Sequence, residues 1–463
     1  MHLRNVSVAV LTLVSLPAFA DRFVVLGPQP DRLPPGLRAA LESRGATVVY
    51  DLGAAGMLVV EAASADVANG LGARAVLRDF TMQSSGDTGS DSFDGEAAGA
   101  ASLDAGPLPT DDQLPLQWGW RAVGADVAYA AGLTGRGVRI AVIDSGANVN
   151  HPDIGPNVNL ALSRSFVAGE GIVPPIVTPA IRHHGTYVTS IIAAPANNGG
   201  IVGVAPEAEV VVLKASDHFG NGGNGSAQLA DLLAAMVYAG EIEARVVNMS
   251  IGGIFSRSGG CSGTYCWTAQ QLADDFVGLA RAAAYIRHRG GLLVVSAGND
   301  GLDLNQSADT LVLPAMLPHA VAVSATAPIA TLAVDPGANL DEFATYSNYG
   351  QRLVTIAAPG GFSRNDYPPT CFRFVAGMNR PCAVFNRVRG LLTPTVYGQT
   401  SGTSAAAPHV AGVAALIIEA AGGNITPDQV EARLREWAVD LGKPGVDEFF
   451  GHGRVDVRGA IAP

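Results

Sequence analysis

A chain of 463 residues is long enough for one large domain with a smaller one attached. Its 56 glycines and its 15% of charged residues, against a usual share of about 25%, suit a compact protein with many tight turns. The formal net charge of -12 and the absence of any long run of Lys and Arg argue against a nucleic-acid partner, because phosphate binding needs clustered cations.

Residues 1–20 are expected to be a secretory signal peptide. Arg4 precedes an apolar stretch at 6–16, which leads to Ala18-Phe19-Ala20, an A-x-A cleavage site. The alternative interpretation is a first buried strand. No other uninterrupted apolar run is long enough to cross a bilayer. We therefore expect a secreted protein without a membrane span, extracellular or periplasmic.

Residues 21–83 are predicted to form a small α+β domain of the ferredoxin-like type. Apolar periodicity and turn residues give the element order β-α-β-β-α-β, which is that of a split βαβ unit. The expected elements lie at 23–26, 36–44, 47–51, 56–61, 65–71 and 75–80.

Residues 84–110 are predicted to be a linker. Ser, Gly, Asp and Ala dominate this acidic segment, and it has almost no large apolar side chain with which to offset the entropy of ordering. Exposed segments of this kind are readily cut by proteases.

Residues 111–463 are predicted to form an α/β domain with a doubly wound, mostly parallel sheet, because short apolar strands alternate with helices. We expect strands at 138–143, 209–214, 246–250, 292–297, 320–325 and 353–357. We expect helices at 186–194, 228–238, 269–289, 404–421 and 427–437. Active sites in such sheets lie beyond the carboxyl ends of the strands.

The four cysteines are expected to form two local disulfides, Cys261 with Cys266 and Cys371 with Cys382, in an oxidising compartment. Each disulfide would close a small loop, for which chain entropy gives roughly 2–3 kcal/mol. Zinc is the alternative, but neither spacing contains the usual C-x2-C pair.

Three residues at the ends of predicted elements could carry acyl-transfer chemistry. Asp144 ends an apolar strand, His184 opens a helix, and Ser404 begins an Ala-rich helix. Acyl transfer needs a hydroxyl nucleophile, an imidazole to accept its proton, and a buried carboxylate to hold the imidazole. A serine at a helix N-terminus also gains an oriented amide and a dipole that favours negative charge.

These three segments, in the order Asp, His, Ser, resemble those of the subtilisin-like serine proteases. The resemblance covers nearly all of residues 114–462. It implies a serine endopeptidase that hydrolyses peptide bonds through an acyl-enzyme on Ser404, with His184 as general base and Asp144 as its orienter. Because Gly185 follows His184 as in the family, the neighbouring His183 is expected to be a partly exposed bystander.

The resemblance also implies the oxyanion and substrate-binding residues. Asn299, which follows an apolar strand and is preceded by Ala297 and Gly298, resembles the family's oxyanion asparagine. Ser250, Ile251 and Gly252 resemble the segment that pairs with the substrate backbone.

By the same resemblance, the loop that contains Gly222 and Gly223 should face the substrate from the opposite side. Residues 220–225 also satisfy G-x-G-x-x-G, so a dinucleotide site is the alternative. Its glycines lie several residues beyond the preceding strand, which argues against that reading.

A structural Ca2+ is a further expectation from the resemblance, and no organic cofactor is expected. The segments at 151–153 and 195–201 look like those that wrap the ion in many members of the family. Asp153 and Asn197 would supply side-chain oxygens, and Asp112 or Gln113 would help to complete the shell. The backbone ligands would come from Pro195, Gly199 and Ile201. The alternative is a hydrogen-bonded turn without metal.

Residues 21–80 resemble the family's inhibitory pro-domain, which implies a zymogen with an intramolecular inhibitor. We also expect a monomer that acts on polypeptide substrates. An accessory module that stays attached is the alternative for this segment. A noncatalytic pseudoprotease that binds peptides is the alternative function. The sequence contains neither G-x-S-x-G nor H-E-x-x-H, which argues against an α/β-hydrolase and a zinc peptidase.

Overall fold

The structure is a computed structural model that describes residues 21–83, 92–93, 108–174, 183–217, 226–262, 265–329, 332–362, 370–375, 378–393 and 395–460. The chain divides into two compact units, Met1–Asp79 and Phe80–Pro463, which are described separately. The expected signal peptide at 1–20 lies outside the described residues.

The smaller unit contains a four-stranded antiparallel sheet with the strand order β2-β3-β1-β4. Its core joins Phe23 and Val25 of the first strand to Leu37 and Leu41 of the helix. The α+β class and the ferredoxin-like strand order agree with the prediction. The elements are β1 Asp21–Leu26, α1 Leu37–Ser43, β2 Thr47–Leu52, β3 Met57–Ala62 and β4 Ala75–Arg78.

The second helix of this unit is shorter than predicted. Instead of a helix over 65–71, the chain makes one 3-10 turn, Ala65–Ala68, which Ser64 caps by accepting a hydrogen bond from the Asp66 amide. The backbone is extended at Asn69, and Gly70 then adopts a φ of 73°. Left-handed glycine ends a helix at low cost, so the turn cannot continue.

The larger unit is built on an eight-stranded sheet with the order β18-β17-β15-β11-β7-β9-β8, with β19 paired to β17. All of these pairs are parallel except β17 with β18. The central strands are buried throughout, as expected for parallel strands covered on both faces. The strands are β7 Arg139–Asp144, β8 Arg164–Ser165, β9 Glu209–Lys214, β11 Val246–Met249, β15 Leu292–Ser296, β17 Ala320–Ala327, β18 Glu342–Phe343 and β19 Ile356–Pro359.

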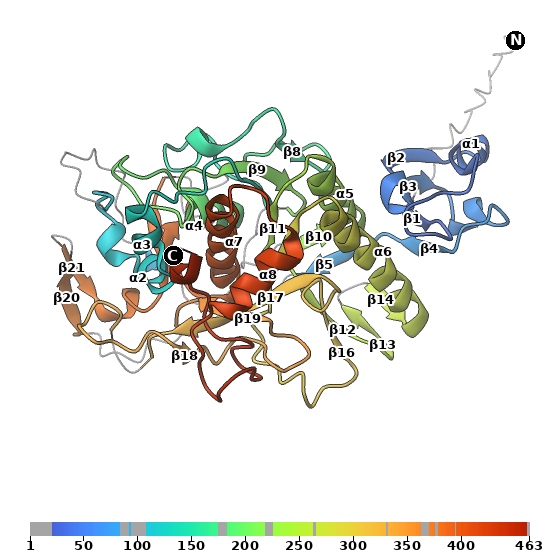
Figure 1. Ribbon diagram of the computed structural model, residues 1–463. Helices are drawn as coiled ribbons and strands as arrows, with labels where there is room; N and C mark the ends of the chain where they lie inside the picture. The colour runs from blue at the N-terminus through green and yellow to red at the C-terminus, as the bar shows by residue number, and fades with distance from the viewer. Residues whose placement is uncertain are drawn as a thin grey trace, which may run out of the picture. The chain divides into compact units, whose positions relative to one another are not determined.

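Two sets of helices pack on this sheet, which is the predicted doubly wound arrangement. α4 and α7 contact each other and the sheet, while α5 and α6 lie side by side and contact β7, β9 and β15 (Figure 1). The long helices are α4 His184–Ala193, α5 Leu229–Glu241, α6 Ala269–His288, α7 Thr403–Ala420 and α8 Pro427–Glu436. The short helices α2 Trp118–Ala122 and α3 Ala125–Ala130 precede the sheet.

Helix α7 runs through the centre of the larger unit (Figure 1). Among the described residues it is the one helix long and apolar enough to cross a membrane, but 89% of that 18-residue window is buried inside the protein. Its apolar residues therefore form the core between α4 and the sheet.

The larger unit also contains short hairpins outside the eight-stranded sheet. Both predicted disulfides are confirmed, one within a hairpin and the other beside a second hairpin. Cys261 is bonded to Cys266 across β13–β14, and Cys371 is bonded to Cys382 beside β20–β21. The remaining strands are β12 Gly253–Ser256, β13 Gly259–Ser262, β14 Tyr265–Thr268, β16 Thr310–Leu313, β20 Phe372–Val375, β21 Met378–Pro381, β22 Val388–Leu391 and β23 Tyr397–Thr400.

Two further segments differ from the sequence-based expectation. The strand expected at 353–357 begins at Ile356, because the amides of Leu353 and Val354 are taken up in a turn by the carbonyl of Gly350. The predicted linker at 84–110 lies mostly outside the described residues. Its residues Ser92–Phe93 (β6) pair with β23 as a third strand, so the linker is not structureless throughout.

The boundary between the two units falls at Asp79/Phe80, a few residues before the expected boundary at 83. Residues Thr81–Gln83 (β5) pair antiparallel with Ser226–Gln228 (β10) of the larger unit. The amide of Leu229 also donates to the carbonyl of Phe80 over 3.0 Å. Backbone pairing therefore assigns residues 80–83 to the larger unit.

Candidate active site

Asp144 is the last residue of β7, which lies between β11 and β9 in the middle of the sheet. Its Oδ1 accepts a hydrogen bond from the amide of Ser145 over 2.7 Å. Beside it in register is Lys214, whose buried ammonium donates to the carbonyl of Ser145 over 2.8 Å. Lys214, to which no sequence motif points, thus holds the turn that follows the carboxylate.

His184 is the first residue of α4 and lies against this carboxylate. Its Nδ1 is 2.8 Å from Oδ1 and 3.0 Å from Oδ2 of Asp144, and both side chains are at most 3% exposed. A carboxylate only accepts hydrogen bonds, so Nδ1 carries the hydrogen and Nε2 is left to accept a proton. The geometry is that of an imidazole held in one tautomer.

The close approach of α4 to β7 depends on Gly185. A Cβ at this position would lie 2.1 Å from the carbonyl oxygen of Gly146 and 3.1 Å from the side chain of Asp144. The amide of Gly185 also donates to Ser145 Oγ over 3.1 Å. The expectation for His183 is wrong, because this residue is fully buried at the start of α4, where its amide bonds to the carbonyl of Leu392.

Ser404 is the second residue of α7 and is 3% exposed. Its carbonyl accepts a hydrogen bond from Ser250 Oγ over 3.2 Å. Since Met249 of β11 is in register with Ile143 of β7, Ser250 follows β11 at the edge where Asp144 ends β7. The structure therefore brings the start of α7 to the strand end that carries the Asp144–His184 pair.

Asn299 is tied to the same helix start. Its Oδ1 accepts from both the amide and the hydroxyl of Thr403, each over 2.8 Å. Since this orientation commits the amide oxygen, the Nδ2 group is the donor that remains available. The amide of Ser404 is among the first four of α7, which have no acceptor within the helix. The Asn299 side chain and the first amides of α7 thus lie together at the start of this helix.

The loop that presents Asn299 is shaped by Asn348, a fully buried residue that the sequence analysis missed. Asn348 Oδ1 accepts from the amides of Asp300 and Leu302, and its Nδ2 donates to the carbonyl of Ala297. Gly298 has a φ of 94°, and a Cβ there would lie 2.3 Å from Asn348 Nδ2. No local pattern in the sequence links Asn348 to this loop.

The predicted substrate-binding residues fall in three places. Ser250, Ile251 and Gly252 follow β11 directly, and Ala297 and Gly298 follow the adjacent strand β15. Gly222 and Gly223 lie outside the described residues. The strand β10, which begins at Ser226, pairs antiparallel with β5 of the same chain. The edge of β10 therefore accepts an extended strand.

The residues predicted to bind calcium are brought together, but their polar atoms have protein partners. Asp153 Oδ1 accepts from Asn198 Nδ2, while its Oδ2 accepts from Tyr397 Oη and from the amide of Ile201. Burial raises the pKa of Asp153. Burial also raises the pKa of Tyr397, and the nearby Asp153 carboxylate raises it further. Asn197 Oδ1 accepts from the amide of Thr110.

A second carboxylate, that of Asp111, holds the loop at 197–199. It accepts hydrogen bonds from three successive amides, those of Asn197, Asn198 and Gly199, over 2.7, 2.9 and 3.0 Å. Amide hydrogens that converge on a carboxylate create an anion site, whereas Ca2+ requires converging oxygens. Among the described residues, no group of three or more His, Cys, Asp and Glu could hold a metal. Asp111 therefore holds this loop through hydrogen bonds within the protein.

The expected oxygen ligand Gln113 is also committed, because its Oε1 accepts from the buried guanidinium of Arg389 over 2.7 Å. Asp112 is exposed. Calcium binding therefore stays a prediction to be tested in solution.

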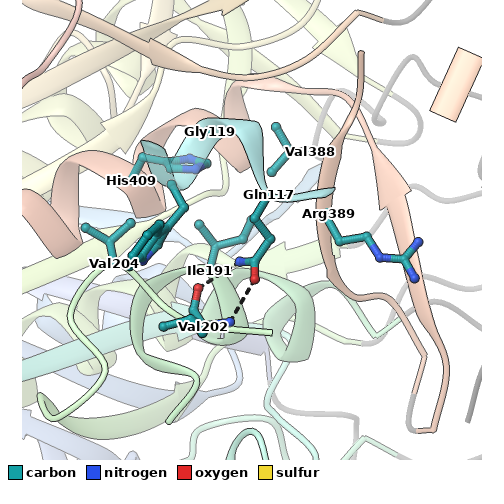
Figure 2. Close-up of a pocket in the computed structure, with 9 residues that line it drawn as sticks. Gln117, Gly119, Ile191, Val202, Val204, Val388, Arg389 and His409 are labelled. Carbon is teal, nitrogen blue, oxygen red and sulfur yellow. Dashed lines mark hydrogen bonds between the residues drawn. The ribbon is translucent and has the colours of Figure 1, made fainter. Parts of the chain in front are cut away.

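A small internal cavity of about 10 Å³ adjoins α7. Gln117 closes one side of it through paired hydrogen bonds with the backbone of Val202, and His409 closes another (Figure 2). A space of this size holds at most one water molecule. The remaining lining residues are Gly119, Trp120, Ile191, Val204, Val388 and Arg389, so none of the predicted catalytic residues lines this cavity.

Comparison with known proteins gives a consistent result. Residues 135–453 match the subtilase family. Subtilisin Savinase of Lederbergia lenta is 31% identical over 347 residues, which are 74% of this chain and 98% of that protein. A thermophilic serine proteinase of Bacillus sp. (strain AK1) is 29% identical over 347 residues, 74% of this chain and 67% of that protein.

Solved structures share the fold. The epidermin leader peptide processing serine protease (EpiP) of Staphylococcus aureus superposes with a TM-score of 0.70 at 19% identity, covering 96% of this chain and 98% of that chain. Fervidolysin of Fervidobacterium pennivorans, a keratinolytic enzyme related to subtilisin, gives a TM-score of 0.66 at 19% identity, covering 96% and 61%.

Proposed function

The chain belongs to the subtilase family of serine proteases, and we propose that it is a secreted endopeptidase that is made as a zymogen. The observation that carries this proposal is the buried hydrogen bond between His184 and Asp144, formed at the strand edge where the start of α7 is anchored. The substrates are polypeptides, and the enzyme acts as a monomer.

In the proposed mechanism Ser404 attacks the carbonyl carbon of the scissile bond while Nε2 of His184 accepts its proton. Asp144 keeps the hydrogen of His184 on Nδ1 and stabilises the imidazolium that forms. The imidazolium then donates its proton to the leaving amine. A water molecule, activated by the same imidazole, hydrolyses the acyl-enzyme and frees Ser404.

Asn299 and the amide of Ser404 are the proposed donors to the oxyanion. The carbonyl carbon of the substrate gains a negatively charged oxygen only as Ser404 adds to it, so donors aimed there stabilise the transition state more than the ground state. The double hydrogen bond from Thr403 to Asn299 Oδ1 supports this role, because it fixes the amide before substrate arrives.

The substrate backbone is proposed to lie between two edges, residues 250–252 and β10. Backbone pairing supplies affinity without regard to sequence, which suits an endopeptidase that acts on extended polypeptides. The small residue Gly252 supports a close approach of another chain at the first edge.

The zymogen proposal is supported by the pairing of β5 with β10. Residues 81–83 of this chain lie at the edge that a substrate strand would use, so a substrate cannot pair there at the same time. Cleavage in the acidic segment that follows residue 83 would release residues 21–83 as the pro-domain. Secretion is inferred from the apolar segment at 6–16 and from the two disulfides.

The proposal is tested by expressing the full chain beside Ser404→Ala and Ser258→Ala, the last an exposed serine outside the site as a matched control. We expect the wild type and Ser258→Ala to lose their N-terminal segment and to cut unfolded polypeptides, and Ser404→Ala to remain full-length and inactive. Equal processing and equal cleavage by the wild type and Ser404→Ala would disprove the assignment of the nucleophile. Absence of cleavage by the folded wild type would disprove the endopeptidase.

A further inference from the structure

Lys214 is the last residue of β9, and its ammonium is buried inside the larger unit. The chain carries 29 Lys and Arg residues, of which only two are lysines, Lys214 and Lys443. The side chain of Lys443 is 76% exposed, whereas that of Lys214 is 0% exposed. Burial of an ammonium costs free energy unless the protein supplies an opposite charge and hydrogen bonds. The position of Lys214 therefore points to a role that an exposed cation could not fill.

The surroundings of Lys214 supply both. Its ammonium donates to the carbonyl of Ser145 over 2.8 Å and lies 3.1 Å from Oε2 of Glu170. Glu170 lies in the segment that follows β8, and its side chain is 30% exposed. The amide of Ala147 donates to the carbonyl of Ile172 in this segment over 2.9 Å. The segment that carries the carboxylate is thus fixed to the turn at the end of β7.

Ser145 connects Lys214 to the carboxylate and imidazole of the active site. The Ser145 amide donates to Oδ1 of Asp144 over 2.7 Å, and its Oγ accepts from the amide of Gly185 over 3.1 Å. The Ser145 carbonyl is the acceptor for Lys214. Gly185 directly follows His184 at the start of α4. A change in the backbone of Ser145 would therefore disturb both the carboxylate and the imidazole.

We propose that Lys214 is a positioning residue for the Asp144–His184 pair and that it acts through Ser145. The ammonium fixes the backbone that keeps Nδ1 of His184 at 2.8 Å from Oδ1 of Asp144. Glu170 balances the charge of the ammonium and holds it over the Ser145 carbonyl. An ammonium is a compact donor on a flexible stem and reaches a carbonyl and a carboxylate from one point, whereas a guanidinium donates in a fixed planar fork. This inference rests on the proposed endopeptidase function and adds a residue that sets its rate.

The first test compares Lys214→Met with Lys443→Met, each matured from the full chain. Methionine is unbranched and adaptable, so it can occupy the space of the lysine stem without a charge or a donor. Lys443 also pairs with a carboxylate, that of Glu448 over 3.2 Å, but at the surface, which makes it the matched control. In Lys214→Met, kcat for a peptide substrate should fall about 10- to 100-fold with KM changed less than about twofold, because a displacement of 1 Å can have an effect of this size. Lys443→Met should have the kinetic constants of the wild type.

A spectroscopic signature separates positioning from a contribution to folding alone. The hydrogen on Nδ1 of His184 is shared with a buried carboxylate, and such a charge-assisted hydrogen bond moves its proton NMR resonance far downfield. Lys214→Met should shift or broaden this resonance while its circular dichroism matches that of the wild type. Lys443→Met should leave the resonance in place.

A second variant keeps the proposal testable if Lys214→Met does not fold. Glu170→Ala removes a partly exposed carboxylate and leaves the ammonium without its ion pair, so kcat should fall by about threefold or more. An unchanged kcat, or an unchanged His184 resonance, in the folded variant would overturn the positioning role and leave the endopeptidase intact. No cleavage at all by the folded wild type would overturn the proposed function itself.

Discussion

Replacement of Asp111 by alanine should destabilise the larger unit strongly. This carboxylate is 3% exposed and accepts three backbone hydrogen bonds from the loop that also contacts Asp153. A hydrogen bond to a charged acceptor contributes about 1.5–3 kcal/mol, and water that enters the enlarged space would recover part of the loss. We therefore expect the free energy of unfolding to fall by about 3–5 kcal/mol.

Urea unfolding followed by circular dichroism measures this effect, with every variant made in a Ser404→Ala background to prevent autolysis. Asp111→Asn should lose about half as much, because its amide keeps one oxygen as an acceptor but presents an NH2 group to the remaining amide. Asp112→Ala is the matched control, since this neighbouring carboxylate is exposed. It should unfold like the parent protein.

The same experiment decides the calcium prediction. If hydrogen bonds alone hold the loop, excess EDTA should leave the unfolding midpoint of the parent protein unchanged. Two results would refute the view that Asp111 takes the place of a cation. One is that EDTA destabilises the parent protein by as much as the Asp111→Ala substitution does. The other is that the Asp111→Ala variant is as stable as the parent protein.

Three other predictions concern catalysis, pH and covalent bonding. Asn299→Ala should lower kcat about 10²–10³-fold with little change in KM, which is the effect known for the corresponding donor of subtilisin. An unchanged kcat in steady-state kinetics would exclude the oxyanion role. Burial lowers the pKa of His409 to about 4, so the unfolded state binds the proton first as the pH falls below about 6.5. As the pH falls from about 6.5 to 4, the contribution of His409 to the free energy of unfolding should decline by up to roughly 1.4 kcal/mol per pH unit. The urea midpoint should therefore depend less on pH in His409→Gln than in the parent protein. Removing the Cys371–Cys382 disulfide by a double Ser substitution should cost roughly 2–3 kcal/mol of unfolding free energy, whereas equal urea midpoints would argue against the loop-entropy account.

Local patterns in the sequence determined most of the secondary structure. Buried parallel strands appear in the sequence as apolar runs. These runs predict β9 with its observed bounds and the bounds of β7 within one residue. Capping boxes at Thr268 and Thr426 begin α6 and α8 where the sequence placed them. The prediction failed at 65–71, where glycine conformation outweighed apolar periodicity.

The sequence also singled out Asp144, His184, Ser404 and Asn299, because each stands at the end of an element whose type its neighbours specify. Tertiary structure alone brought Asn348 to the loop of Asn299, Asp111 to the loop at 197–199, and Phe80 to Phe255. These contacts join residues tens to hundreds of positions apart. Neither helical nor strand periodicity carries information over such distances, since the contacts depend on how completed elements pack against one another.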